Sequence, residues 1–337
     1  MNYEFYMDKC IELAKLSEGK VSPNPLVGCV IVDDNGEIIA QGRHEMYGQA
    51  HAEQNALRNA GDSAKNATLF VNLEPCNHWG KTPPCAKLII DAGIKKVVVG
   101  IRDLNKKASG GIETLRNAGI EVIEGVLEKE CKKLNEIFFF SLTHSRPFIA
   151  IKTATTLDGK IAAADGSSKW ITSDGAREKV QSLRNCYDAI LTTASTVLAD
   201  NPSLTCRKIG GRNPVRIVVD RHNTLNKHNE YKVFNLDGTK VIHHVGDFDE
   251  DFCKKLYDDG IKSVLIEAGG KFNASVINLG LADKIYQFFA PKVLCDNAAI
   301  SWVYGNLCGN INDAINFRIS AVEIFEPDIM LELYPKM

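Results

Sequence analysis

Apolar residues in the first half of the chain recur first at the spacing of a helix and then at the spacing of β-strands. From Asn2 to Leu16 they recur at helical spacing, which predicts an amphipathic helix. The segment 26–41 predicts a buried strand, a hairpin turn and a second strand. Helices are then expected at 51–60 and 85–92, and strands at 67–73, 96–101 and 120–123. This alternation predicts an α/β/α layered domain over residues 1–145.

The second half shows the same alternation after Ser145-Arg146-Pro147, which we interpret as the domain boundary. A strand is expected at 148–153 and a helix at 174–185. Further strands are expected at 189–192, 215–220, 240–244, 263–267 and 284–290. The chain of 337 residues is long enough for two cores of ordinary domain size. We therefore predict a second α/β domain over residues 146–337.

Composition limits the compartment and the partners that we expect. A net charge of −2 argues against binding to nucleic acid, which usually requires a strongly basic surface. The segment Met1–Asp8 has no signal-peptide pattern, and no apolar run reaches the length of a membrane span. We expect a cytoplasmic protein with reduced thiols and a small-molecule substrate. A homo-oligomer is also expected, because symmetric assemblies of identical chains are common.

The sharpest chemical pattern is a His-x-Glu followed by two Pro-Cys steps. Imidazole and thiolate groups suit zinc, and three protein ligands leave a fourth position for water, as in catalytic sites. His51, Cys76 and Cys85 are therefore predicted to hold one zinc ion, which would lower the pKa of a bound water to about 7. Glu53, two residues after His51, is predicted to carry the proton of that water to the substrate.

This pattern is the signature of zinc-dependent nucleobase deaminases, with one departure. Eight residues separate Cys76 from Cys85 here, where the usual spacing is two. A closed structural zinc with His44 or His78 as the fourth ligand is an alternative, as is a site without metal. Glu53 favours the catalytic interpretation, because a scaffold has no use for a carboxylate beside the metal.

A glycine pair in the second half suggests a phosphate site. No Gly-x-Gly-x-x-Gly follows the first strand of this half, so a conventional dinucleotide fold is not expected. The segment 264–273 instead runs from a strand through two glycines into a helix, where free N–H groups suit a phosphate. Arg221 follows another strand and is a candidate partner for a ribose 2′-phosphate of a dinucleotide; a solvent-exposed surface arginine is an equally open interpretation.

Longer motifs carry a resemblance that spans nearly the whole chain. They are residues 23–28, 51–53 and 74–85 in the first half and 152–160, 170–173 and 196–205 in the second. These motifs closely resemble the RibD family of bifunctional riboflavin biosynthesis proteins. The resemblance implies a cytidine deaminase-like first domain and a dihydrofolate reductase-like second domain. It implies hydrolytic deamination of 2,5-diamino-6-(5-phosphoribosylamino)pyrimidin-4-one to 5-amino-6-(5-phosphoribosylamino)uracil, followed by NADPH-dependent reduction of the ribosyl group to ribityl.

The resemblance also assigns side chains to ligands. Asn24 would hold the pyrimidine, and His78 and Lys81 would contact its ring or phosphate. The residues expected against NADPH are Ala154, Trp170, Thr196, Asp200, Gly269, Gly270, Lys271, Phe272, Asn273, Ala274 and Ser275. Those expected against the substrate of the second step are Ser168, Arg184, Leu204, Arg207 and Glu267. Asp200 is the nearest candidate proton donor for the reduction.

Three alternatives stay open at this point. Thr193 and Ser195 stand where many relatives have glycine, and Cys295-Asp296 replaces another glycine pair. These departures allow a second domain that binds a ligand without reducing it. A nucleic-acid-editing deaminase is disfavoured by the near-neutral charge, and a zinc-stabilised scaffold is disfavoured by Glu53.

Overall fold

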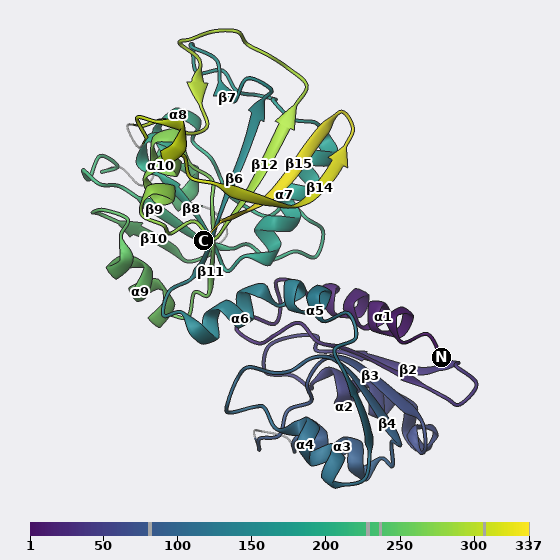
Figure 1. Ribbon diagram of the computed structural model, residues 1–337. Helices are drawn as coiled ribbons and strands as arrows, with labels where there is room; N and C mark the ends of the chain where they lie inside the picture. Colours follow the sequence, from purple (N-terminus) through teal and green to yellow (C-terminus); the bar gives the residue numbers. More distant parts are fainter. Residues whose placement is uncertain (80–82, 227–229, 236–237, 306–307, 337) are drawn as a thin grey trace. The chain divides into compact units, whose positions relative to one another are not determined.

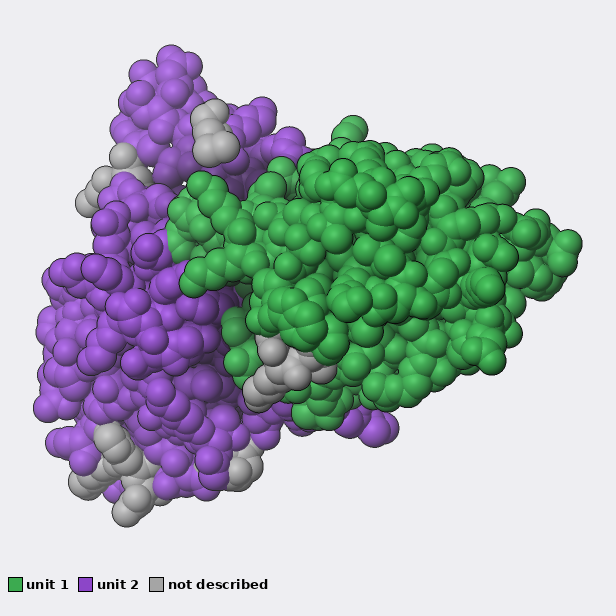
Figure 2. Space-filling view, turned by 90° about the horizontal axis from the view of Figure 1, so that it is seen from below, with its two compact units in different colours: residues 1–144 green, residues 145–337 purple. Residues whose placement is uncertain are grey.

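The computed structural model describes residues 1–79, 83–226, 230–235, 238–305 and 308–336. The chain divides into two compact units, residues 1–144 and 145–337, which are coloured separately in Figure 2. Each unit has its own sheet and its own apolar core. Within the described part of the chain, no helix combines the length and the apolar character needed to cross a bilayer.

The described residues of unit 1 contain a sheet of five strands in the order β2-β1-β3-β4-β5. The strands are β1 (Gly28–Val32), β2 (Ile38–Arg43), β3 (Thr68–Leu73), β4 (Lys96–Ile101) and β5 (Glu121–Glu124). β1 runs antiparallel to β2 and β3, whereas β3, β4 and β5 are parallel. Every residue of β1 and of β3 is buried, as expected for central strands covered on both faces.

Helices cover both faces of this sheet (Figure 1). One face carries α1 (Tyr3–Lys15) and α5 (Glu128–Leu134), after which α6 (Glu136–Thr143) follows. The other carries α2 (Ala52–Ala60), α3 (Cys85–Asp91) and α4 (Gly111–Asn117), and a short 3-10 helix, Gly61–Ala64, follows α2. The α/β/α layers predicted from the alternating pattern are thus confirmed.

Local sequence explains how α1 and β1 place the loop between them. The Asn2 side chain caps α1 by accepting the Phe5 N–H at 3.2 Å. The helix lies directly on Gly28, where a Cβ would come 2.1 Å from the Cys10 carbonyl oxygen. β1 begins at Gly28, two residues later than predicted, because the backbone of Leu26 forms hydrogen bonds with the side chains of Asn135 and Asn72 and not with a neighbouring strand. The loop that carries Asn24 is therefore anchored at both ends.

The described residues of unit 2 form a mixed sheet of eight strands in the order β10-β9-β8-β11-β6-β12-β15-β14. The strands are β6 (Phe148–Thr156), β8 (Ala189–Thr193), β9 (Val215–Val219), β10 (Val241–His244), β11 (Ser263–Ile266), β12 (Lys284–Ala290), β14 (Phe317–Phe325) and β15 (Asp328–Pro335). The strands from β10 to β12 in this order are parallel, and the hairpin β14–β15 extends the sheet in antiparallel fashion.

The remaining elements of unit 2 surround this sheet. Its helices are α7 (Asp174–Cys186), α8 (Ala194–Asp200), α9 (Glu250–Asp258) and α10 (Gly270–Asn278), with 3-10 turns at Lys232–Phe234 and Ile311–Asp313. The short strands β7 (Lys160–Ala162) and β13 (Ile300–Ser301) pair with each other apart from the main sheet. The sequence analysis did not predict α9 or the hairpin β14–β15, so the unit contains more regular structure than expected.

Candidate active sites

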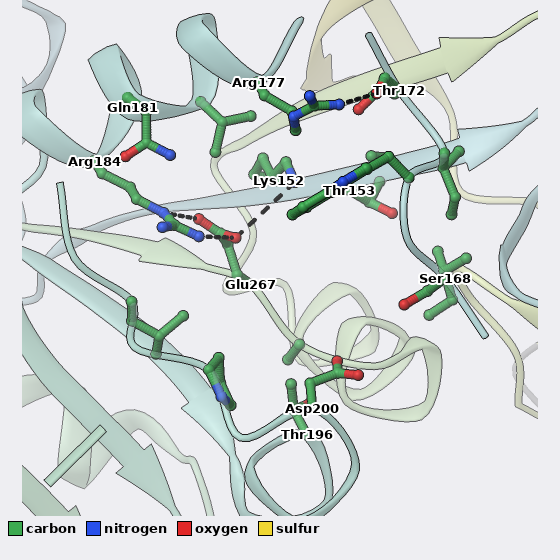
Figure 3. A pocket seen from close by; sticks show the side chains of 18 of the residues that line it. Lys152, Thr153, Ser168, Thr172, Arg177, Gln181, Arg184, Thr196, Asp200 and Glu267 are labelled. Atoms are coloured by element: carbon green, nitrogen blue, oxygen red, sulfur yellow. Dashed lines mark hydrogen bonds and ion pairs between the residues drawn. The ribbon is translucent and has the colours of Figure 1, made fainter. Parts of the chain in front are cut away.

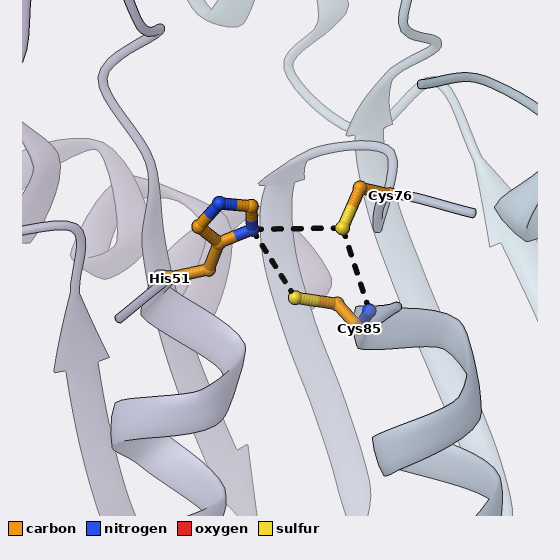
Figure 4. Close-up of side chains that lie close together, drawn as sticks. All are labelled: His51, Cys76 and Cys85. Carbon is orange, nitrogen blue, oxygen red and sulfur yellow. Dashed lines mark hydrogen bonds between the residues drawn. The ribbon is translucent and has the colours of Figure 1, made fainter. Parts of the chain in front are cut away.

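The three predicted zinc ligands converge in unit 1 (Figure 4). His51 precedes the first residue of α2, Cys76 lies in the loop after β3, and Cys85 opens α3. The Nδ1 atom of His51 lies 3.5 Å from the Cys76 Sγ and 3.4 Å from the Cys85 Sγ. All three ligand atoms lie within 4.8 Å of one another. Residues far apart in the sequence therefore present one nitrogen and two sulfur atoms to one point.

These distances fit a tetrahedral zinc ion. Zinc binds thiolate sulfur and imidazole nitrogen at distances that place neighbouring ligand atoms about 3.6 Å apart at tetrahedral angles. The two observed nitrogen-to-sulfur distances, 3.5 Å and 3.4 Å, are close to that separation. His51, Cys76 and Cys85 are thus suited to hold the metal without rearrangement of the backbone.

Hydrogen bonds within the cluster favour a thiolate at Cys76. The Cys85 thiol and the His51 ring lower the pKa of Cys76 to about 4, against the effect of burial. The backbone N–H of Cys85 at the start of α3 also donates to this sulfur, at 3.4 Å. The pKa of Cys85 is raised by the adjacent Cys76 and by burial. The cluster therefore already favours charge on one of its sulfur atoms.

Glu53 is a buried carboxyl group beside this cluster. It lies in the first turn of α2, two residues from His51, and its exposed fraction is only 3%. Burial raises the pKa of Glu53 to about 7, although His51 opposes the rise. A carboxyl group with a pKa near neutrality can both accept and donate a proton at physiological pH. The geometry and the electrostatics both suit the proton carrier expected at this position.

The polar residues near this cluster include predicted substrate contacts and the two alternative fourth ligands of the metal. Asn24 lies beside His44, with 3.2 Å between its Nδ2 atom and the His44 Nε2 atom. The other ring nitrogen of His44 lies 3.0 Å from the Ala50 carbonyl oxygen, and burial lowers the pKa of this ring. Both ring nitrogens of His44 therefore have partners that are not part of the metal cluster. His78 is exposed on the loop after Cys76, and Lys81 lies outside the described residues.

Glu74 is a supporting residue of the site that was not predicted from the sequence. Its buried carboxylate accepts three backbone N–H groups, from Asp103 at 3.0 Å, Gly110 at 2.9 Å and Ile112 at 3.2 Å. These bonds hold the loop after β4 against the segment that carries Cys76. Its only signal in the sequence is its place in the Glu-Pro-Cys motif, two residues before the metal ligand Cys76.

A cavity of about 320 Å³ lies in unit 2 (Figure 3). This volume is at the small end of the range for ligand-binding pockets. The predicted residues that line it are Ala154, Ser168, Trp170, Arg184, Thr196, Asp200, Leu204, Arg207, Glu267 and Gly269. Several of them stand at the carboxyl ends of parallel strands, where open α/β sheets usually bind ligands. One cavity thus brings together most of the residues that the resemblance assigned to this unit.

Charged side chains form an ion-pair cluster at one side of this cavity. Glu267 accepts two hydrogen bonds from Arg184, both at 2.8 Å, and its Oε2 atom lies 4.0 Å from the Lys152 Nζ (Figure 3). Burial would raise the pKa of Glu267, but Arg184 and Lys152 outweigh it and lower the pKa to about 2. Burial lowers the pKa of Lys152. The sequence analysis quoted Lys152 within a motif but assigned it no role.

The segment that carries Trp170 is held in place by two further cations. The Lys292 ammonium donates to the carbonyl oxygens of Trp170 and Ile171, at 2.9 Å and 2.8 Å. The Arg177 guanidinium lies 4.6 Å from the centre of the Trp170 ring and donates to the Thr172 carbonyl oxygen. Trp170 itself is largely exposed. These contacts, and not packing in the core, therefore hold this part of the cavity wall in position.

Other predicted cofactor residues lie elsewhere. Arg221 is exposed and pairs with Asp247 at 2.7 Å, outside the cavity lining. Gly270 packs tightly against the chain, since a Cβ there would come 2.2 Å from the Ser301 carbonyl oxygen, whereas Gly269 has open space. Only Gly269 of the predicted loop lines the cavity. The remaining residues, Lys271, Phe272, Asn273, Ala274 and Ser275, continue α10 behind it.

Comparison with known proteins assigns the chain to a family. Residues 1–101 match the cytidine and deoxycytidylate deaminase zinc-binding region, and residues 147–331 match the RibD C-terminal domain. The chain is 38% identical to riboflavin biosynthesis protein RibD of Actinobacillus pleuropneumoniae, over 97% of this chain and 94% of that protein. It is 35% identical to RibD of Escherichia coli, over 99% of both.

A solved structure agrees with this assignment over the full length. This relative is a diaminohydroxyphosphoribosylaminopyrimidine deaminase/5-amino-6-(5-phosphoribosylamino)uracil reductase from Thermotoga maritima. It superposes with a TM-score of 0.91 at 42% identity, covering 99% of each chain. The expected cytidine deaminase-like first domain and reductase second domain are confirmed. The chain belongs to the RibD family and is a bifunctional deaminase and reductase of riboflavin biosynthesis.

Proposed function

We propose that unit 1 hydrolytically removes an amine from 2,5-diamino-6-(5-phosphoribosylamino)pyrimidin-4-one and that unit 2 reduces the ribosyl group of the product with NADPH. The convergence of His51, Cys76 and Cys85 beside the buried carboxyl group of Glu53 carries the first half of this proposal. The name of the Thermotoga maritima relative describes the same pair of reactions. The cavity around Glu267 supports the second half.

In the deamination, His51, Cys76 and Cys85 hold the zinc ion, and Asn24 holds the pyrimidine. Zinc supplies a Lewis acid that makes water nucleophilic at neutral pH. Glu53 moves two protons: its carboxylate takes one from the attacking water and passes it to the ring nitrogen, and then takes the proton of the added hydroxyl and passes it to the amine, which leaves as ammonia. A pKa of about 7 allows Glu53 to perform both halves of this transfer.

In the reduction, NADPH supplies the hydride, and the chain positions the two reactants. Gly269 fits a cofactor phosphate, because it has open space at the start of α10, where backbone N–H groups are available. Thr196, Asp200 and Trp170 line the same cavity and would contact the cofactor there. Arg184 donates two hydrogen bonds to Glu267 and therefore orients that carboxylate. Arg207, which lines the same cavity, is the candidate ligand for the phosphate of the substrate.

A coupled assay tests both activities in order. Zinc-loaded protein is mixed with the diaminopyrimidine ribotide, and ammonia release and NADPH absorbance are followed together. We expect substrate-dependent loss of NADPH that disappears in Glu53→Ala. The same variant should still oxidise NADPH when it receives the deaminated uracil. Ammonia release without NADPH oxidation by the unmodified protein would contradict the reductase assignment and support a second unit that only binds ligand.

The remaining expectations concern the state of the protein in the cell. We propose a cytoplasmic homo-oligomer that acts on a small phosphorylated pyrimidine and not on nucleic acid, consistent with its net charge of −2. Light scattering coupled to size-exclusion chromatography tests the assembly, and a monomer at micromolar concentration would contradict it.

A further inference from the structure

A chain of hydrogen bonds runs from the backbone beside a metal ligand to the predicted pyrimidine contact. The Ala50 carbonyl oxygen lies 3.0 Å from the His44 Nδ1 atom, and the His44 Nε2 atom lies 3.2 Å from the Asn24 Nδ2 atom. His44 is buried, with an exposed fraction of 2%, and its ring meets the His51 ring edge to face at 5.5 Å. Asn24 is therefore connected to the zinc cluster through a single imidazole.

The chemistry of the two ends determines the direction of these hydrogen bonds. A carbonyl oxygen only accepts, so the His44 Nδ1 atom must carry the proton that Ala50 receives. A neutral ring then offers a lone pair at Nε2, and the Asn24 amide donates to it through Nδ2. The Asn24 amide lies with Nδ2, and not Oδ1, against this nitrogen, which fits a ring that accepts there. The Oδ1 atom of Asn24 is thus left for another partner.

The backbone on either side of Asn24 is already fixed. Its own N–H donates to the Val21 carbonyl oxygen at 2.8 Å. Two residues later, Leu26 donates its N–H to the Asn135 Oδ1 at 2.8 Å and accepts from the side chains of Asn135 and Asn72, at 3.0 Å and 2.9 Å. The main freedom left to Asn24 is rotation of its amide, which exchanges an acceptor for a donor.

We propose that His44 is a positioning residue that fixes the amide of Asn24 with its oxygen directed to the pyrimidine. The site then selects a ring edge that presents an N–H group, such as the ring N–H or the exocyclic amine of an aminopyrimidine. A ring that presents only an acceptor at this edge would face the Asn24 oxygen unfavourably. This assignment rests on the proposed deaminase function and adds the polarity with which its substrate is recognised.

A double-mutant cycle in the full-length, zinc-loaded protein tests this role. His44→Phe keeps a flat ring but removes the acceptor, and we expect kcat/KM for ammonia release to fall about tenfold, mainly through KM. His44→Gln can place an amide oxygen near the position of Nε2 and should restore most of the loss. In the Asn24→Ala background, His44→Phe should cost almost nothing further. Multiplying losses would overturn the proposal, because His44 would then act independently of Asn24.

Two further readouts separate this role from a metal-binding or a general structural one. Zinc content and the visible spectrum of the cobalt-substituted protein should not change in His44→Phe, and a changed spectrum would make His44 a ligand. NADPH oxidation on the deaminated uracil should also persist, which monitors the fold of the chain.

A nitrogen-15 NMR spectrum of the zinc-loaded protein provides a test that needs no substrate. It reports which ring nitrogen of His44 carries the proton, and we expect Nδ1. A proton on Nε2 would overturn the proposal even if the wild type deaminates the pyrimidine. Conversely, a proton on Nδ1 with no ammonia release would leave the positioning geometry standing and contradict only the proposed substrate.

Discussion

Replacement of Glu267 by glutamine should expose how strongly the ion pairs of the reductase cavity stabilise unit 2. The pKa of this buried carboxyl group falls from an ordinary 4.5 to about 2, despite the opposing effect of burial. Each tenfold change in proton affinity corresponds to about 1.4 kcal/mol, so ionised Glu267, with its pairs to Arg184 and Lys152 set against the cost of burial, stabilises the folded state by about 3 kcal/mol. Removal of one member of a buried ion pair costs a similar amount, about 3–5 kcal/mol.

Urea unfolding followed by tryptophan fluorescence measures this loss. In a Trp79→Phe background the remaining tryptophans, Trp170 and Trp302, both lie in unit 2 and report its transition. The matched control is Glu323→Gln, which breaks a half-exposed pair with Lys179 in the same unit. We expect the control to lose less than about 1 kcal/mol, because exposed ion pairs contribute little.

The pH dependence of the stability difference between wild type and Glu267→Gln can refute this reasoning. A carboxylate with a lowered pKa stabilises the folded state above its unfolded pKa, and this contribution is lost as the pH falls toward the folded value. The gap between wild type and Glu267→Gln should therefore be full at pH 7 and should shrink between about pH 4.5 and pH 2. A gap that stays constant through this range, or that matches the Glu323→Gln control at pH 7, would show that the charge of Glu267 is not what stabilises the unit.

Four further substitutions test other parts of the two sites. Glu53→Gln should lower ammonia release by about 10²–10⁴-fold with zinc content unchanged, and loss of zinc would instead make the residue a ligand. Gly270→Ala should destabilise unit 2 in the same urea assay, because its Cβ would come 2.2 Å from the Ser301 carbonyl oxygen. Gly269→Ala should leave stability unchanged but raise the KM for NADPH, and the reverse pattern would exchange the two roles. Arg207→Ala should raise the KM for the phosphorylated uracil several-fold, and an unchanged KM would exclude it as the phosphate ligand.

The elements that the sequence predicted well are those whose apolar pattern follows directly from burial. β1 and β3 are buried at every residue, so their largely apolar runs identified them as strands. β14 escaped notice for the opposite reason. Its pairing with β15 slips between Ile319 and Ala321, so the two-residue period breaks in the middle of the strand. Ile319, Val322 and Ile324 are also exposed, so no buried face marked the segment as a strand.

The same contrast separates the metal ligands from the residues that support them. Zinc accepts few side-chain types, so His51, Cys76 and Cys85 could be identified from residue type and order alone. Glu74 and Asn135 bind backbone N–H and C=O groups, which every segment of a chain offers, so no spacing rule reveals their partners. Asn135 contacts Leu26 across 109 positions of the sequence.

Residue type also leaves open how one charge divides its hydrogen bonds among several partners. Arg184 is predicted to bind the substrate, and its planar guanidinium suits a carboxylate as well as a phosphate. In the structure, the same planarity serves two hydrogen bonds to Glu267 and a third to the Thr205 carbonyl oxygen. Since a guanidinium has five N–H donors, three of them are committed before any ligand binds. The sequence can therefore name the cations near a substrate site, but only the internal hydrogen bonds show how many of their donors remain for a ligand.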